Sequence, residues 1–399
     1  MSTSSREPSS GGSSRWLAID ASRGIAMAFV CLSHFGTGYF AGIGHSERQI
    51  WTDRIAMLAS PAFMLISGSM LGMLASERSR KQFEAVRDRF FDRGLFLLIV
   101  AHALIVIAHL PLHAGRHAWI RWGFITDTIA VCLLVGPALI ERLPSRMRLA
   151  LAGAMYTGSW WTVLAWHPSG LVARFLKDTV VGPMGDSTRL SNFPILPWLA
   201  LYIAGTVLGE EMVARRRRFE SPAAVVASLG AAALLVAVAW TVVIGAGNPD
   251  GLWPVSDVYS RVADLGSPFQ KVPPGPLYLL GYGGLATLLT AAIMRAEERR
   301  AAMPALRGAA LVGRASLFVF VVQYYLNFAL VPVLHLPDTS WWPLFFVVSL
   351  AALYIATTFW MSFGLNRLIT VGYPFARARA RVAIPPASHP SSGLPTVGA

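Results

Sequence analysis

The sequence alternates between long apolar runs and short polar connections. The runs are about twenty residues long, which is the length at which an α-helix crosses the hydrocarbon core of a bilayer. A membrane β-barrel would alternate polar and apolar residues in segments of about ten, a pattern that we do not find. The sequence therefore predicts an all-α, polytopic integral membrane protein with about ten transmembrane helices, at residues 17–40, 55–75, 94–112, 122–140, 149–167, 193–209, 223–244, 275–294, 309–334 and 342–365.

Composition and charge agree with a membrane protein. Hydrophobic residues make up 54% of the chain and charged residues 14%, whereas a soluble domain carries about 25% charged residues. The formal net charge is +13, but the cations cluster at the ends of the apolar runs, as in "ERSRKQFEAVRDRFFDR" and "RRRR". They therefore predict membrane topology rather than nucleic-acid binding. By the positive-inside rule, both termini lie in the cytoplasm of a multi-pass protein in the cell (inner or plasma) membrane.

Domain organisation follows from the same pattern. Residues 1–16 are rich in Ser and Gly and predict a disordered cytoplasmic N-terminus. Residues 17–366 form one transmembrane domain, and residues 367–399 form a basic, Pro-rich cytoplasmic tail. Cys31 and Cys132 both lie inside apolar runs, without the spacing of a metal-binding motif. We therefore expect neither a disulfide framework nor a metal site.

The first apolar run carries charged and titratable residues that are costly in hydrocarbon. Asp20 and Arg23 are three residues apart near its inner end, so they form either a structural ion pair or a site in which Arg23 holds an anionic group from the cytoplasm. His34 follows Arg23 by eleven residues, which on a helix returns to nearly the same face roughly 16 Å further along. The ordinary alternative is a histidine that bonds a neighbouring helix.

A second histidine follows a glycine-rich break. His45 ends the stretch "FGTGYFAGIGH", where the glycines predict that the helix ends or turns. It is either a solvated loop residue or a group at the outer mouth of the first span. Both His34 and His45 have an ordinary pKa near neutrality, so either one could act as a general base.

Three further residues are candidates for function. Asp127, near the outer end of the run 122–140, could orient a histidine or bond an acceptor hydroxyl. The ordinary alternative is a helix-end carboxylate bonded to Thr126 or Thr128. Arg314 enters the run 309–334 from the inside, where it either snorkels or binds phosphate. Lys271 lies in an outer connection. In contrast, the small residues of "SPAFMLISG" predict close helix packing.

Four stretches, taken together, resemble a known family. They are "IDASRGIAMAFVCLSH", "ASPAFMLISG", "NFPILPWLALYIAGTVLG", and "FQKVPPGPLYLLGYGGLATLL" followed by "LVGRASLFVFVVQYYL". They are similar to transmembrane acyltransferases, above all to bacterial membrane proteins related to heparan-α-glucosaminide N-acetyltransferase. The similarity extends from residue 19 to about residue 330. Arg23 and His34 also fit the R-x10-H motif of the O-acylating acyltransferase-3 family.

The resemblance carries expectations about the site. In the heparan enzyme an asparagine stands at the position of His34, and the catalytic histidine falls at His45, so the resemblance does not choose between the two as base. Many relatives have a late histidine where this chain has Gln323, which cannot take a proton at neutral pH. The tryptophan and aspartate of the heparan enzyme have only approximate counterparts in Trp51 and Asp53.

The resemblance implies a membrane-embedded acyltransferase. An acyl group, expected to be acetyl, would move from cytoplasmic acyl-CoA to a hydroxyl or amine of a sugar or glycan at the outer side, in line with a role in the cell envelope. Arg23 and Arg314 would bind the donor, and either His34 or His45 would be catalytic, by direct transfer or through an acyl-histidine. The expected substrate-binding residues are Asp20, Asp127 and Lys271. A transporter or flippase for a lipid-linked or small polar substrate, and a non-catalytic scaffold, are the alternative functions.

Overall fold

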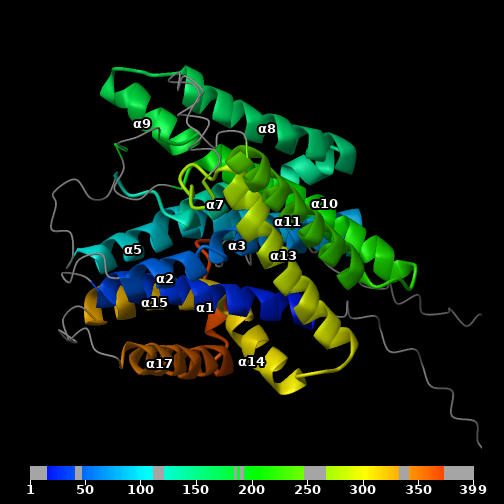
Figure 1. Ribbon diagram of the computed structural model, residues 1–399. Helices are drawn as coiled ribbons and strands as arrows, with labels where there is room; N and C mark the ends of the chain where they lie inside the picture. Colours follow the sequence, from blue (N-terminus) through cyan, green and yellow to red (C-terminus); the bar gives the residue numbers. More distant parts are fainter. Residues whose placement is uncertain are drawn as a thin grey trace, which may run out of the picture.

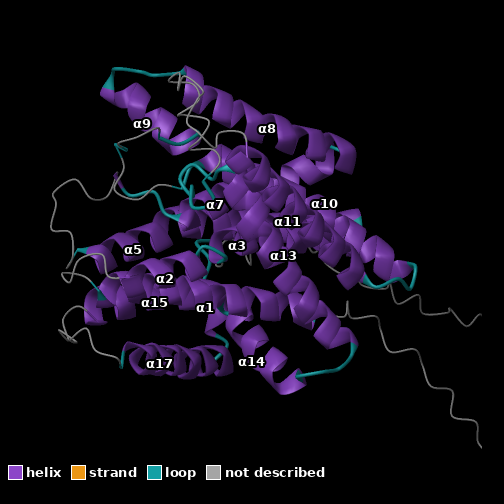
Figure 2. Cartoon of the chain, in the orientation of Figure 1, coloured by secondary structure: helices purple, strands orange, loops and turns teal. Residues whose placement is uncertain are grey.

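The computed structural model describes residues 16–40, 47–110, 121–183, 187–188, 193–246, 267–331 and 341–372. These residues form helices joined by turns and loops (Figure 2), which confirms the all-α class. The helices are α1 (Leu17–Tyr39), α2 (Glu47–Ala56), α3 (Ala59–Glu77), α4 (Arg80–Phe96), the π-helical η1 (Leu97–Ala101), α5 (His102–His109), α7 (Ile125–Arg142), α8 (Ser145–Ala165), α9 (Leu171–Val180), α10 (Ile195–Arg217), α11 (Pro222–Ala246), α13 (Pro276–Glu298), α14 (Met303–Arg314), α15 (Ser316–Tyr324), the π-helical η2 (Tyr325–Leu330), α17 (Trp342–Ser362) and the 3-10 segment η3 (Leu365–Leu368).

The number of spans differs from the expected ten. Within the described residues, seven helical segments are long and apolar enough to cross a membrane, or eight if one bent pair counts as a span. The two expected spans that do not qualify correspond to α7 and α8. α7 includes Asp127, Glu141 and Arg142 among its 18 residues, and such charges lower its apolar character. The structure therefore shows a multi-pass membrane protein but does not confirm the count of ten.

The span expected at residues 309–334 is broken in the structure. α14 ends at Arg314 and α15 begins at Ser316, and the two helices are bent by 72°. Ala315 lies between them with a backbone conformation outside the helical region. A run of apolar residues predicts length but not a bend, because the sequence contains no proline at this point. At the break, Ala315 and Ser316 are buried, whereas Arg314, the last residue of α14, is exposed.

α1 lies at the centre of the helix packing. It contacts α2, α3, α13, α14, α15, η2 and α17. In Figure 1, α17 lies at one edge of the molecule and α8 with α9 at the opposite edge. The Glu297 carboxylate on α13 accepts hydrogen bonds from the backbone N–H groups of Leu17 and Ala18, at 3.2 and 2.9 Å. This contact satisfies two of the N–H groups that every helix start leaves open and fixes the N-terminal end of α1.

Glycine permits the close contact between α3 and α10. A Cβ atom added at Gly72 would lie 1.9 Å from the Thr206 carbonyl oxygen, and one added at Gly209 would lie 2.0 Å from the Ser69 carbonyl oxygen. Helices in a bilayer associate largely through such close packing of small residues. Gly68, in the stretch "SPAFMLISG", makes the same kind of contact, since a Cβ atom there would lie 2.0 Å from the Tyr202 carbonyl oxygen. The close packing expected for this stretch is therefore confirmed.

We expect Gly72→Ala to destabilise the protein by about 1 to 3 kcal/mol, because the added methyl group forces two backbones apart. Gly153→Ala is the matched control, since a Cβ atom at Gly153 on α8 has no heavy atom within 4 Å. That change should be neutral or stabilise by up to about 1 kcal/mol through helix propensity. Thermal unfolding in detergent, followed by tryptophan fluorescence, measures both. Equal midpoints for the two variants would contradict the packing argument.

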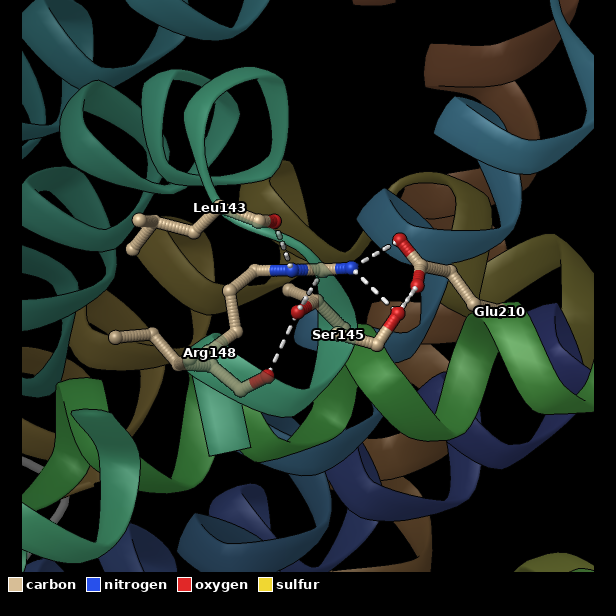
Figure 3. A network of polar contacts seen from close by, with 6 residues as sticks. Leu143, Ser145, Arg148 and Glu210 are labelled. Carbon is tan, nitrogen blue, oxygen red and sulfur yellow. Dashed lines mark hydrogen bonds and ion pairs between the residues drawn. The ribbon is translucent and has the colours of Figure 1, made fainter. Parts of the chain in front are cut away.

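A buried polar network joins α8 to α10. The guanidinium group of Arg148 donates to the Leu143 carbonyl oxygen at 3.2 Å, the Thr206 hydroxyl at 2.6 Å and the Ser145 hydroxyl at 3.3 Å, and it pairs with the Glu210 carboxylate. Figure 3 shows the guanidinium group between Leu143 and Glu210. Only 3% of the Arg148 side chain is exposed. A charge this deep requires several hydrogen bonds, and the network supplies them.

Candidate functional site

His34 lies in the C-terminal half of α1 and points towards α15. Its Nδ1 atom is 2.9 Å from the Oε1 atom of Gln323. Eleven residues earlier on α1, the Nη2 atom of Arg23 donates to the Ser316 hydroxyl at 2.6 Å. Ser316 and Gln323 are both on α15. The expectation that Arg23 and His34 share one helix face is therefore confirmed.

Aromatic rings surround the His34 imidazole. Its centroid lies 4.5 Å from the ring of Tyr324, 5.3 Å from that of Phe328 and 6.4 Å from that of Phe320. The side chain keeps partial exposure although the rings pack around it. His34 therefore has a defined position in the bundle, with one ring nitrogen held by a polar partner.

Two histidines that we did not predict lie near this cluster. His109, on α5, packs its ring 4.5 Å from Phe328 and 5.0 Å from Tyr324. Its Nδ1 atom is 2.8 Å from the Ile105 carbonyl oxygen. His109 and His34 thus contact the same two aromatic residues. The sequence did contain a signal for both histidines. His102 and His109 are titratable residues, seven positions apart, inside an apolar run.

The second unpredicted histidine is paired with a predicted carboxylate. The Nδ1 atom of His102 is 2.9 Å from the Oδ1 atom of Asp127, and both side chains are largely buried. The other carboxylate oxygen accepts the Phe124 N–H at 2.9 Å, at the start of α7. Asp127 therefore bonds a histidine, as one interpretation of the sequence expected. It also caps its own helix, but through the Phe124 N–H rather than through Thr126 or Thr128, the partners that the other interpretation expected.

The predicted donor-binding residues lie together in one cavity of about 360 Å³. Arg23 and Arg314 both line it, although they are far apart in the sequence, because α14 packs against α1. Arg93 and Asn366, which the sequence analysis did not select, also line it. The cavity also reaches Phe320, whose ring contacts His34.

A hydroxyl group in the cavity wall has no hydrogen-bond partner among the described residues. This group belongs to Thr126, which is 2% exposed. Buried polar groups usually have a hydrogen-bond partner. The Thr126 hydroxyl is therefore suited to form a hydrogen bond with a molecule in the cavity. Thr126 precedes Asp127 on α7, but Asp127 and its partner His102 are not in the lining of this cavity.

Asp20 lies at the opposite end of α1 from His34. The two residues are fourteen positions apart, or about 21 Å along a helix. Asp20 lines a separate cavity of about 420 Å³ that shares Met70, Leu74, Phe90 and Arg93 with the first one. The structure therefore places Asp20 near the arginines rather than beside His34.

Lys271 lies in the connection before α13. Its ammonium group is 5.2 Å from the centre of the Phe193 ring. Burial lowers the pKa of Lys271 below its ordinary value, and the charge of Asp53 opposes this shift. The other residue expected on this side, His45, lies outside the described residues.

Comparison with known proteins identifies the family. No curated protein matches the chain. The family model for the catalytic part of heparan-α-glucosaminide N-acetyltransferase matches residues 15–242, which are 228 of the 399 residues. The match includes His34, Arg23 and Asp127, whereas Lys271, Arg314 and Gln323 follow it in the chain. The chain therefore belongs to the heparan-α-glucosaminide N-acetyltransferase family, whose members are membrane acetyltransferases that take the acetyl group from acetyl-CoA.

Proposed function

We propose that this protein moves an acetyl group from cytoplasmic acetyl-CoA to a hydroxyl or amine of a sugar or glycan at the outer side of the cell membrane. The observation that carries this proposal is the cavity lined by residues of α1, α3, α4, α7 and the α14–α15 break. It has arginines in one part of its wall, and another part is formed by Phe320, whose ring contacts His34. A donor with an anionic head and a neutral thioester end matches this arrangement.

The arginines of the cavity suit the nucleotide end of the donor. Arg23, Arg93 and Arg314 present guanidinium groups, which bind phosphate through charge-assisted, often bidentate hydrogen bonds. α15 begins at Ser316 in the same wall, and a helix start adds a partial positive charge. The rest of the wall is largely apolar and suits the thin pantetheine arm. Thr126 would bond an amide or carbonyl group of that arm.

His34 would act as the general base. The acceptor oxygen or nitrogen attacks the thioester carbonyl carbon while His34 takes the acceptor proton. The carbon–sulfur bond then breaks, and the imidazolium returns this proton to the departing CoA thiolate. Atoms and charges balance without a metal ion or a redox partner. An acyl-histidine at the same residue is the other route, and a trapped acyl-His34 in an acceptor-free reaction would distinguish it.

The acceptor would approach from the side of Lys271. The Lys271 ammonium group would stabilise the negative charge that develops on the thioester oxygen during attack. Asp127 would act through His102, which it holds by a hydrogen bond. Asp20, at the inner end of α1, would contact the donor rather than the acceptor, because it lines the cavity next to the arginines.

We expect Arg23→Gln and Arg314→Gln each to raise the KM for acetyl-CoA by about 10- to 100-fold, since a hydrogen bond to a charged group contributes about 1.5 to 3 kcal/mol. Arg299→Gln is the control, because Arg299 is an exposed arginine outside the lining of this cavity. Release of CoA by purified protein in detergent, with a panel of amino and hydroxyl sugars, gives both KM and kcat. An unchanged KM in both cavity variants would show that the donor binds elsewhere.

One observation favours transport as a second candidate function. The bend of 72° between α14 and α15 is a discontinuity of the kind that forms substrate sites in secondary transporters. A transporter or flippase would carry a lipid-linked or small polar substrate without consuming acetyl-CoA. Substrate flux into proteoliposomes in the absence of any acyl-CoA would support this function, whereas CoA release that requires an acceptor would support acetyl transfer.

A further inference from the structure

We propose that Gln323 is a positioning residue that fixes the His34 imidazole with its proton on Nδ1, so that Nε2 is the nitrogen that accepts the acceptor proton. This inference rests on the proposed function, in which His34 is the base. It assigns a role to the residue that stands where many relatives have a histidine, and it also specifies which atom of His34 reacts.

The hydrogen bonds of Gln323 determine which way its amide group faces. The Nε2 atom of Gln323 donates to the Phe320 carbonyl oxygen at 3.0 Å. A carbonyl oxygen can only accept a hydrogen bond, so the amide nitrogen must face it. The amide oxygen therefore faces the other way, where it accepts the Nδ2–H of Asn327 at 3.0 Å and lies 2.9 Å from His34.

This orientation fixes the proton of the imidazole. Since Oε1 of Gln323 has no hydrogen to donate, the Nδ1 atom of His34 must be the donor in the contact of 2.9 Å. A neutral imidazole carries one proton, so its Nε2 atom then holds the lone pair. The tautomer that can take a proton through Nε2 is thus selected before any substrate binds.

The residues that follow Gln323 in the chain prevent the His34 imidazole ring from flipping. Tyr324 and Phe328 pack against the imidazole and belong to the same continuous segment as Gln323 and Asn327, which changes from α15 to the π-helical η2 at Tyr325. π-Helical turns inside α-helices are frequent at functional sites. Gln323 is fully buried, and burying an amide is costly unless its hydrogen bonds are made. One short segment therefore supplies both the acceptor and the rings that hold His34.

The first test is the tautomer itself. We would record ¹⁵N spectra of protein labelled at histidine nitrogens, with the His34 signals assigned by their loss in His34→Gln. The wild-type protein should show a protonated Nδ1 and an unprotonated Nε2. Gln323→Met, which keeps the length of the side chain without the acceptor oxygen, should show a mixture of tautomers. Gln323→Glu restores an acceptor and should restore the Nδ1–H form. A wild-type Nε2–H tautomer would overturn the proposal.

Kinetics of the same variants give the second test. Gln323→Met should lower kcat by about 10- to 100-fold, a part of the 10² to 10⁴ that a positioned general base contributes, with the KM for acetyl-CoA unchanged. Gln323→Glu should recover most of this loss, and Gln82→Met, at an exposed position of α4, should have no effect. An unchanged kcat in a folded Gln323→Met would contradict the positioning role. A wild-type protein that has the expected tautomer but transfers no acetyl group would instead contradict the proposed function alone.

Discussion

His34→Ala should lower kcat for acetyl transfer by about 10² to 10⁴, the contribution of a positioned general base, while acetyl-CoA still binds. This expectation rests on the position of His34 in the structure. His34 is held by Gln323 at 2.9 Å and by aromatic rings at 4.5 to 6.4 Å, and it contacts a wall residue of the arginine-lined cavity. The measurement is CoA release, with separate determination of acetyl-CoA affinity by calorimetry or competition.

His45→Ala and His167→Ala should be compared in the same assay. His167 is an exposed histidine after α8 and controls for the loss of an imidazole. If His45→Ala loses turnover and His34→Ala keeps it, the base is His45 and the assignment to His34 is wrong. If both lose turnover, acetylation of protein incubated without acceptor would show which histidine receives the acyl group first.

Arg148→Met should destabilise the protein by about 3 to 5 kcal/mol, the usual cost of removing one partner of a buried ion pair. The change leaves the Glu210 carboxylate without its cation and removes the hydrogen bonds to Leu143, Ser145 and Thr206. Thermal unfolding in detergent or nanodiscs measures the loss. The protein should also lose the contact between α8 and α10 before the rest of the bundle unfolds.

Two further variants test whether the uncompensated Glu210 charge causes this loss of stability. Arg80→Met removes an arginine whose side chain is 94% exposed and which lies 4.0 Å from Glu84, so it should cost less than about 1 kcal/mol. The double variant Arg148→Met, Glu210→Leu removes both charges and should recover much of the stability, because no uncompensated charge stays buried. Equal losses for the single and double variants would show that packing rather than charge accounts for the effect.

The break at Ala315 illustrates a feature that the sequence did not reveal. The stretch "LVGRASLFVFVVQYYL" reads as one apolar span, and its periodicity is the same whether the helix is straight or bent. The bend depends on what packs around it. Gly313 is one such contact, since a Cβ atom there would lie 1.8 Å from the Asp20 carbonyl oxygen of α1. Such a contact between two backbones cannot be read from either stretch alone.

The histidines show a similar limit. His102 and Asp127 are 25 residues apart, and His34 and Gln323 are 289 residues apart. No period or spacing connects residues at such distances, because their contact depends on how separate helices pack. The sequence could mark Asp127 and His34 as costly residues in apolar runs. It could not pair either one with its partner.

The sequence by itself determined the helical membrane architecture and the common face of Arg23 and His34. In hydrocarbon a spanning segment must satisfy its own backbone, so long apolar runs become helices, and the helical period then fixes which residues share a face. The tertiary structure decided the cavity that unites Arg23 with Arg314, the bend at Ala315 and the hydrogen bond from His34 to Gln323. These features depend on side chains of different helices meeting at a few ångströms, which only the packing of the whole bundle specifies.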